Sequence, residues 1–435
     1  MKLFYRLFIF LYPVIAKVIS SNNAKAAAWV KGRKDIFERI EKALQNNEAP
    51  VIWLHCSSLG EFEQGRPVIE KLKKNNEKWK VLLTFFSPSG YEIRKNYEGA
   101  DWIFYLPMDS PANARKFLSI TKPSLVLFVK YEFWFYYLTE IKKQNIPLLL
   151  ISGIFRESQA FFKWYGGFYK SMLHCFTHFF VQNETSAELL SGIGFTDNVT
   201  IAGDTRFDRV IEIANSFQPI EIIEQFIGET NKVIVAGSTW TEDDEELHHY
   251  VNTHPEIKFI IAPHDIQHER IDECLQFYKN AVLFSSYKLQ VAGKKDEVLT
   301  THDSQLVKYN CLIIDNIGML SKLYKYATIC YVGGAFGGDG VHNVLEAAVY
   351  HKPVVFGPEY EKYVEAAELI NTEGGFSVEN ALELEQVFDE LLKEESKYEV
   401  TCTKAGEYVK NKSGATDKIV SFIYEKRLLT NVSNN

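Results

Sequence analysis

VIWLHCSSLGE, residues 51–61, joins an apolar run to small polar residues and a carboxylate. The run VIWLHC contains no Lys, Arg, Asp or Glu, which is typical of a strand buried on both faces. The stretch FEQGRPVIEKLKK, from residue 62, carries apolar residues at helical spacing. A buried strand followed at once by an amphipathic helix is the repeating unit of a parallel sheet covered by helices.

The same alternation of apolar runs and helical patterns continues along most of the chain. Apolar runs recur at 80–86, 124–130, 146–152, 177–182 and 198–203, and again at 232–238, 257–263, 311–315, 327–334 and 352–357. Between these two series, residues 206–230 are helical and acidic, without a strand. The pattern predicts two doubly wound α/β domains, residues 23–212 and 213–435, that bind ligands at the carboxyl ends of their strands.

Length and composition exclude several classes of protein. A chain of 435 residues is too long for one ordinary core, in agreement with two domains. The net charge of −8 argues against binding to nucleic acid. The six cysteines form no C-x-x-C pair and several lie in apolar runs. We therefore expect buried thiols in a reducing compartment rather than a disulfide framework or a zinc site.

The first 22 residues form a separate segment. MKLFYRLFIFLYPVIAKVIS has basic residues around an uncharged run that is short for a bilayer span of about 20 residues. Three interpretations are open: an anchor or interfacial helix, a buried helix, and a cleaved secretory signal. The basic flank favours an anchor at an anionic lipid surface, with its aromatic residues in the interface: Tyr5, Phe8, Phe10 and Tyr12.

Glu61 is the first carboxylate after the strand at 51–56. With Ser58 it fits the S-x-x-E capping box of a helix start. The same position suits catalysis, because the helix dipole favours an ionised carboxylate, which can act as a general base. Gly60 would let a ligand approach the backbone closely. Taken alone, the local pattern favours the cap.

Two other loops of the first half carry candidate side chains. FFSPSGYE (85–92) places Ser87 and Gly90 at a helix start, where they would cap the helix or bind an anion or a sugar hydroxyl. Glu132 stands among aromatic residues in VKYEFWFYY (129–137). A carboxylate in such surroundings is either paired or functional, or else it points to solvent.

Arg206 lies between two acids in AGDTRFDRV (202–210), at the end of the first half. Its guanidinium could stabilise a leaving phosphate or a substrate carboxylate. The alternative is a local ion pair with Asp204 or Asp208.

The second half offers a glycine-rich loop and a histidine pair. VGGAFGGDGVHNVLEAA (332–348) follows a strand and precedes a helix, as a phosphate-binding loop should, although it does not match G-x-G-x-x-G. The alternative is a surface loop. His264 and His268 stand four residues apart, but no third metal ligand is visible. Carboxylates in one half and a nucleotide-type loop in the other are typical of a two-domain glycosyltransferase of the GT-B type.

Eleven motifs together carry a resemblance to a known family. In chain order they are WLHCSSLGE, TFFSPSG, LPMD, the Glu-x-Trp of YEFW, SGIF, AGDTRFD, AGST, APH, DNIGML, YVGGAF and HNVLEAA. In this order and spacing the sequence resembles the 3-deoxy-D-manno-octulosonic acid (Kdo) transferases of lipopolysaccharide assembly. The resemblance extends from the N-terminal segment to about Phe356.

The resemblance implies a GT-B enzyme with two Rossmann-like domains that face a cleft, anchored at the cytoplasmic face of the inner membrane. The donor would be CMP-Kdo and the acceptor a lipid A precursor, lipid IVA, without a metal or another cofactor. Glu61 would be the general base, and Glu132 and Arg206 would support the transition state. The acceptor side would comprise Ser57, Ser58, Gly60, Ser87 and Gly90. The CMP side would comprise Pro263, His264, Gly318, Met319, Leu320, Gly333, Gly334, Asn343, Val344, Leu345 and Glu346.

Several positions depart from the family pattern. The family commonly has Lys at Arg206, Arg at His264, an acidic residue at Met319 and Glu at Lys130. Its proline-containing form of the HNVLEAA motif is also absent here. These changes affect the donor side more than the base. At His264 the nucleotide contact of the family is expected to be either lost or dependent on pH.

Two other functions remain open at this point. One is a GT-B glycosyltransferase that uses a UDP-sugar, and the other is a non-catalytic membrane adaptor with this fold. The adaptor predicts that Glu61 is dispensable, whereas the transferase predicts that Glu61 is essential and that its neighbour Glu63 is replaceable.

Overall fold

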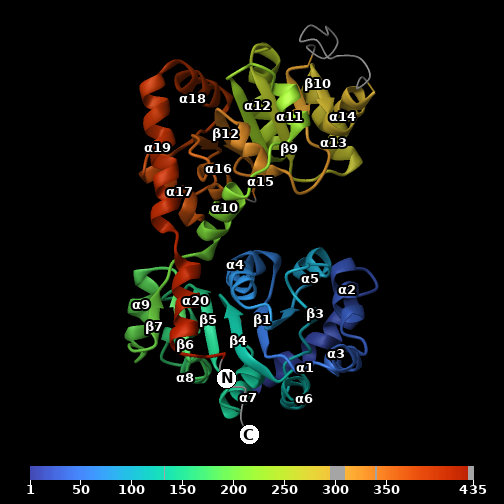
Figure 1. Cartoon of the computed structure of the whole chain (residues 1–435), viewed down its shortest axis with the longest axis vertical. Helices are drawn as coiled ribbons and strands as arrows, with labels where there is room; N and C mark the ends of the chain where they lie inside the picture. Colours follow the sequence, from blue (N-terminus) through green and yellow to red (C-terminus); the bar gives the residue numbers. More distant parts are fainter. Residues whose placement is uncertain (132, 294–308, 339, 430–435) are drawn as a thin grey trace. The chain divides into compact units, whose positions relative to one another are not determined.

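The computed structural model describes residues 1–131, 133–293, 309–338 and 340–429, which form two compact units (Figure 1). Unit 1 contains Met1–Arg209 and the chain from Ser413 onward, and unit 2 contains Val210–Lys412. The expected boundary at 212–213 lies close to the first point of division. The expected second domain differs at its end, because the last helix packs in unit 1.

Unit 1 is built on a seven-stranded parallel sheet with the order β3-β2-β1-β4-β5-β6-β7. The strand order reverses between β1 and β4, which is where ligands bind in such sheets. The strands are β1 (Val51–Cys56), β2 (Lys80–Phe85), β3 (Trp102–Tyr105), β4 (Pro123–Val129), β5 (Leu148–Gly153), β6 (His178–Val181) and β7 (Val199–Ile201).

Helices cover both faces of this sheet, because alternate residues of its central strands point to opposite sides. Trp53 and Phe128 pack in one apolar cluster, and Leu54 and Leu127 pack in another. The helices of unit 1 are α1 (Lys2–Ile19), α2 (Ala24–Gly32), α3 (Ile36–Leu44), α4 (Leu59–Asn75), α5 (Pro88–Arg94), α6 (Pro111–Thr121), α7 (Phe135–Lys143), η1 (Ala160–Phe162), α8 (Gly167–Leu173), α9 (Glu184–Ser191) and α20 (Ala415–Glu425); α10 (Thr205–Asn215) crosses the division.

The C-terminal helix α20 belongs to unit 1. Ile419 and Ile423 are buried in the same cluster as Leu72 of α4. Asp208 accepts hydrogen bonds from the backbone nitrogens of Gly414 (2.5 Å) and Thr416 (2.7 Å), at the start of the helix. The sequence pattern identifies a charged helical tail, but it does not reveal which apolar surface the tail covers.

Unit 2 repeats the architecture with the strand order β10-β11-β9-β8-β12-β13-β14, again all parallel. Its order reverses between β8 and β12. The strands are β8 (Val233–Thr239), β9 (Lys258–Pro263), β10 (Ala281–Leu283), β11 (Cys311–Ile313), β12 (Ile329–Val332), β13 (Val354–Phe356) and β14 (Gly375–Ser377). The edge strands β10 and β14 were not predicted.

The helices of unit 2 are α11 (Glu221–Ile227), α12 (Thr241–Thr253), α13 (His268–Phe277), α14 (Phe284–Ala292), α15 (Leu320–Leu323), η2 (Tyr324–Tyr326), α16 (Leu345–Ala348), α17 (Val364–Asn371), α18 (Ala381–Lys393) and α19 (Glu395–Lys412). Three of them, α12, α13 and α18, share one large apolar cluster with the strands, to which α12 contributes Leu247 and α18 contributes Phe388. The stretch 289–305 is polar and contains glycine, which predicts a loop; most of it lies outside the described residues, and its first residues end α14.

The N-terminal helix α1 lies on unit 1 through one side. The Tyr5 hydroxyl donates to Oδ2 of Asp109 at 2.5 Å, and the Tyr12 ring packs against Trp29 and Phe86. The expectation that Tyr5 and Tyr12 face lipid is therefore wrong, because both rings pack on the protein. None of the described helices has the length and apolarity needed to cross a membrane.

The other side of α1 is apolar and exposed, so the helix is not a buried core helix. The exposed apolar residues of α1 are Leu3, Phe4, Leu7, Phe8, Phe10, Leu11, Val14, Ile15, Val18 and Ile19. Contiguous apolar surface on this scale usually marks a contact with a partner or a membrane.

Candidate active site

Glu61 lies in the first turn of α4, directly after the carboxyl end of β1. Its Oε2 accepts a short hydrogen bond from the backbone nitrogen of Ser57. The Ser58 side chain makes no capping hydrogen bond within the described part of the chain, and the Glu61 carboxylate accepts from Ser57 rather than from the N-cap residue Ser58. The structure therefore does not show the predicted capping box. The N–H of Ser57 and the positive end of the helix both favour an ionised Glu61.

Two charged or polar side chains that sequence reasoning missed come from the same edge of the sheet as Glu61, and one of them, Tyr131, interacts with Glu61. Tyr131 follows β4 and Arg156 follows β5, so both come from carboxyl ends of neighbouring strands. Burial raises the pKa of the Tyr131 hydroxyl, Arg156 lowers it and Glu61 raises it. All three groups therefore share one electrostatic environment beside the switch point of the sheet. The only available signal was that each residue closely follows a predicted strand.

His55 of β1 and Trp134, the residue before α7, form a hydrogen bond next to this site. The indole nitrogen of Trp134 donates to Nε2 of His55 at 3.1 Å. Because Nε2 accepts, the proton of the neutral ring lies on Nδ1, which donates to Oγ1 of Thr84 at 2.9 Å. The Trp134 ring also stacks against Phe86, with centroids 4.5 Å apart. These contacts fix the loops after β1, β2 and β4 to one another.

The predicted acceptor residues of the second loop have structural contacts. The backbone nitrogen of Ser87 donates to the carbonyl of Ser57 at 2.8 Å, and its side chain caps α5 by accepting from Ser89 nitrogen. A Cβ at Gly90 would lie 2.4 Å from the Phe85 ring, so this glycine permits close packing of α5. At Gly60, by contrast, a Cβ would meet nothing within 4 Å, and the backbone there is exposed.

Arg206 forms the local ion pair that was the alternative interpretation. Its Nε donates to Asp204 at 2.9 Å, and Nη2 lies 2.8 Å from the same carboxylate. Asp204 is buried and also accepts from the Gln64 amide at 2.9 Å. Burial raises the pKa of Asp204, but Arg206 and Lys130 outweigh it and lower the value. The third predicted catalytic residue, Glu132, lies outside the described residues.

Three rings form a stack at the strand ends of unit 2. The His264 ring stacks on Trp240 (centroids 4.6 Å apart) and on His342 (4.4 Å). Nε1 of Trp240 donates to Nε2 of His342 at 3.1 Å. The rings come from the loops after β8, β9 and β12, on both sides of the switch point. Trp240 was not predicted as a site residue, although it directly follows a strand.

The glycine-rich loop is held rigidly by a buried acid. Asp243 accepts from the backbone nitrogens of Gly334 and Trp240, each at 2.8 Å, and from the Tyr331 hydroxyl at 2.6 Å. Burial raises the pKa of Asp243, and these hydrogen bonds only partly offset it. A Cβ at Gly333 would lie 2.5 Å from a backbone oxygen, and Gly334 has a φ of +96°. The two glycines are buried by this packing and do not form a surface loop.

The remaining predicted CMP residues differ in how much of them a ligand can reach. Val344 and Leu345 are buried, so only their backbone is available for such a role. The amide nitrogen of exposed Asn343 donates to Glu346 at 3.0 Å. Gly318 and His264 are exposed, Met319 and Leu320 are half-buried, and Pro263 is buried at the end of β9. Across the described residues, no group of three metal-ligating side chains is present.

Residues 34–209 match the family model described as 3-deoxy-D-manno-octulosonic-acid transferase (Kdo transferase). This match lies within unit 1 and covers the loops that carry Ser57, Glu61, Tyr131, Arg156 and Arg206. Together with the curated relatives it shows that the chain is a glycosyltransferase similar to Kdo transferases.

Curated relatives extend the similarity into unit 2. The chain is 27% identical over 347 residues to a 3-deoxy-D-manno-octulosonic acid transferase of Aquifex aeolicus, covering 78% of this chain and 86% of the relative. A transferase of the same name from Chlamydia trachomatis serovar A is 26% identical over 391 residues, 86% of each chain. A bifunctional glycosyltransferase/methyltransferase of Fusobacterium nucleatum is 27% identical over 385 residues, but the chain spans only 55% of its length.

Solved structures support the fold assignment alone. A UDP-GlcNAc 2-epimerase from Neisseria meningitidis is similar with a TM-score of 0.59 at 18% identity, over 86% of this chain and all of that one. A glycosyltransferase from Rickettsia africae gives a TM-score of 0.53 at 15% identity, over 88% of this chain. The chain thus has two parallel sheets, and its structural neighbours are GT-B-like.

Proposed function

We propose that the chain transfers Kdo from CMP-Kdo to a lipid A precursor, with inversion and with Glu61 as the general base. The observation that carries this proposal is the placement of Glu61. It lies at the switch point of a family-matched sheet, where the N–H of Ser57 and the start of α4 favour its ionised form. The relatives named as Kdo transferases supply the sugar, and the resemblance described above supplies CMP and the lipid acceptor.

The proposed chemistry is balanced by this chain's own residues. The acceptor hydroxyl gives its proton to Glu61 as its oxygen bonds to the anomeric carbon of Kdo. The bond from that carbon to the phosphate oxygen breaks, and CMP leaves with the electron pair through an oxocarbenium-like transition state. Arg156 and Tyr131 share the electrostatic environment of Glu61 and would help to orient the acceptor and the Kdo carboxylate. Because a nucleoside monophosphate leaves, the proposal assigns no role to a metal.

We place the CMP moiety at the ring stack of unit 2. Two imidazoles and an indole offer flat faces and N–H groups, which suit a nucleobase and a phosphate. His264 stands where the family commonly has Arg, so this position lacks a permanently charged guanidinium. Asp243 would support this site indirectly, by fixing the backbone of Trp240 and Gly334.

We further propose that α1 binds in the interface of the inner membrane, at its cytoplasmic face. The exposed apolar side of α1 supports this, as do its basic ends at Lys2 and Lys17. A lipid acceptor would be reached most directly by an enzyme that lies on the same surface. Phe8 and Phe10, which were expected to contact lipid, are exposed on this helix.

The deciding experiment is product analysis with the purified full chain. CMP-Kdo or a panel of UDP-sugars is supplied with lipid IVA, and the mass of the lipid product is measured by mass spectrometry. We expect a mass increase of Kdo with CMP-Kdo only. Turnover of a UDP-sugar alone would assign the other glycosyltransferase function, and no turnover of any donor would favour the adaptor.

A further inference from the structure

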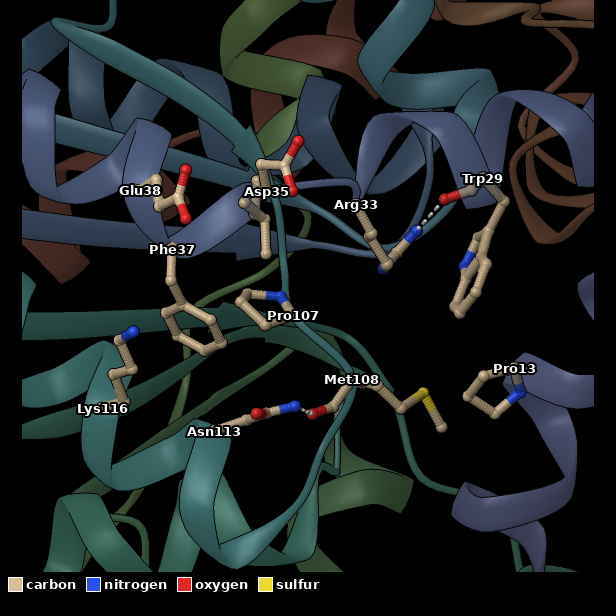
Figure 2. A pocket seen from close by; sticks show the side chains of 11 residues that line it. Pro13, Trp29, Arg33, Asp35, Phe37, Glu38, Pro107, Met108, Asn113 and Lys116 are labelled. Carbon is tan, nitrogen blue, oxygen red and sulfur yellow. Dashed lines mark hydrogen bonds between the residues drawn. The ribbon is translucent and has the colours of Figure 1, made fainter.

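A cavity lies in unit 1 beside the N-terminal helix (Figure 2). It has a volume of about 460 Å³ and is enclosed by α1, the α2–α3 turn and the segment that leads into α6. Pro13, Phe37 and Met108 give it apolar walls, and Trp29 and Arg33 give it hydrogen-bond donors. None of these residues belongs to the predicted acceptor or CMP sites.

The indole nitrogen of Trp29 has no hydrogen-bond partner among the described residues. The side chain is only 6% exposed, so its N–H group is also shielded from bulk water. In Figure 2 the nitrogen lies on the edge of the indole that faces Arg33 and the cavity. A buried donor without an acceptor is costly, and this calls for an explanation such as a bound acceptor.

Arg33 brings a positive charge to the same wall without a carboxylate partner among the described residues. Its guanidinium donates to three main-chain carbonyls, those of Leu106 (2.9 Å), Phe86 (2.8 Å) and Trp29 (3.3 Å). It also lies over the Trp29 ring, 4.0 Å from the centroid. Burial lowers the pKa of Arg33 to about 9, which shows how poorly its charge is compensated. Three of its five N–H groups are used, so two remain to donate to a ligand.

The other charged groups of the cavity stand at its rim. Asp35, Glu38 and Lys116 are exposed, and Lys116 lies over the Phe37 ring at 4.9 Å. Water and salt screen the two exposed carboxylates far more than they screen Arg33. The electrostatic character of the inner wall is therefore set by Arg33 and the Trp29 N–H group.

We propose that this cavity binds the phosphate headgroup of an amphiphile. The guanidinium of Arg33 and the indole N–H of Trp29 donate to phosphate oxygens, and Pro13, Phe37 and Met108 contact the adjoining apolar part. The apolar walls favour an amphiphile over free phosphate, and Pro13 connects the cavity to α1, whose outer side is apolar. This site does not depend on the identity of the sugar donor.

The same arginine links the cavity to the candidate acceptor loop. Arg33 holds the carbonyl of Phe86, the residue before Ser87, and the Phe86 ring stacks on Trp134. A phosphate bound at Arg33 would thus contact the group that positions this loop. An amphiphile bound here would sit directly behind the loop that is proposed to receive the acceptor.

The experiment uses the full chain, with indole ¹H–¹⁵N signals as the readout and Trp29→Phe to assign the signal of Trp29. Dihexanoyl phosphatidic acid, dihexanoyl glycerol and inorganic phosphate are added separately. We expect the Trp29 signal to move with phosphatidic acid at concentrations where the other two have little effect. Trp29→Phe keeps an aromatic ring over Arg33 but removes the donor, so we expect about tenfold weaker binding of phosphatidic acid by titration calorimetry.

Trp79→Phe is the matched control, because Trp79 is a buried indole of unit 1 outside the cavity. It should bind phosphatidic acid as the unchanged chain does, and thermal unfolding checks that both variants are folded. An unmoved Trp29 signal, or equal binding by Trp29→Phe, would overturn the proposal. An equal effect of dihexanoyl glycerol would overturn phosphate recognition, and an equal effect of inorganic phosphate would overturn the choice of an amphiphile in favour of a free anion.

Discussion

Nε1 of Trp240 donates to Nε2 of His342 at 3.1 Å while the ring of His264 lies flat against both. The hydrogen bond requires an unprotonated Nε2 on His342, so the indole orients that imidazole and selects its tautomer. Residues 240, 264 and 342 are far apart in sequence, and only the convergence of three strand ends brings them together.

Trp240→Phe should weaken CMP binding about five- to tenfold, because an aromatic face for His264 remains but the donor to His342 is lost. Titration calorimetry with CMP measures the effect on the full chain. Trp79→Phe, which changes a buried indole in unit 1, should bind CMP normally. Unchanged affinity in Trp240→Phe would show that the stack does not contribute to the nucleotide site.

His264→Arg should make CMP binding tighter. A guanidinium is always charged and offers a planar fork of donors that matches a phosphate, whereas an imidazole offers at most two N–H groups. The CMP dissociation constant of the full chain measures the effect. A loss of affinity would mean that the ring stack matters more than a charge at this position.

Glu61→Gln should lower kcat by at least about two orders of magnitude while CMP binding stays nearly normal, because an amide cannot accept the acceptor proton. Glu63→Gln is the matched control in the same helix. Glu63 accepts from Arg94 at 2.7 Å, a half-exposed ion pair whose loss should cost at most about 1 kcal/mol of stability. Steady-state rates with CMP-Kdo measure both, and substantial turnover by Glu61→Gln would exclude Glu61 as the base.

Replacing Phe4 and Phe10 by Asp should release the protein from anionic vesicles. Both rings are exposed, 68% and 70%, so the changes remove apolar contact and add negative charge without touching the packed side of α1. Vesicle sedimentation measures the effect, and activity on detergent-dispersed acceptor should be kept.

This double variant is a sharper test than deletion of residues 1–20. Deletion would also uncover Trp29 and Phe86 and would remove the Tyr5 partner of buried Asp109. Undiminished sedimentation of the double variant with vesicles would contradict membrane binding through α1.

Acid should destabilise the packing of α20 through His178. Burial, with a smaller contribution from Lys426, lowers the pKa of His178 to about 4, and its ring stacks on Phe422 of α20 at 4.2 Å. The unfolded chain takes up the proton at about pH 6.5, so this stabilisation is complete above pH 6.5 and is lost as the pH falls toward 4.

The loss should amount to about 3 kcal/mol, from a shift of roughly 2.5 pKa units. Denaturant unfolding at pH 7 and at pH 4.5 measures it, and His178→Gln should show a shallower decrease over the same range. Identical pH dependence in the two proteins would remove His178 as its origin.

The sequence by itself determined the strand–helix alternation, the two parallel sheets and the loops in which function should be sought. Continuous apolar runs such as VIWLHC require burial on both faces, and the polar residues after them must fall at the carboxyl ends of the strands. Glu61, His264 and the glycine-rich loop could be named for this reason, since their positions follow from local pattern and from the family motifs.

Only the tertiary structure decided which of these residues meet and which have other partners. Arg206 is bound to Asp204, Gly90 is needed for packing, and Val344 and Leu345 are buried, which no local pattern could show. Tyr131, Arg156 and Trp240 join the sites from strands that are neighbours in the sheet but distant in the chain. Side-chain partnership depends on strand order and on helix packing, and both are set by non-local burial rather than by the residues adjacent in sequence.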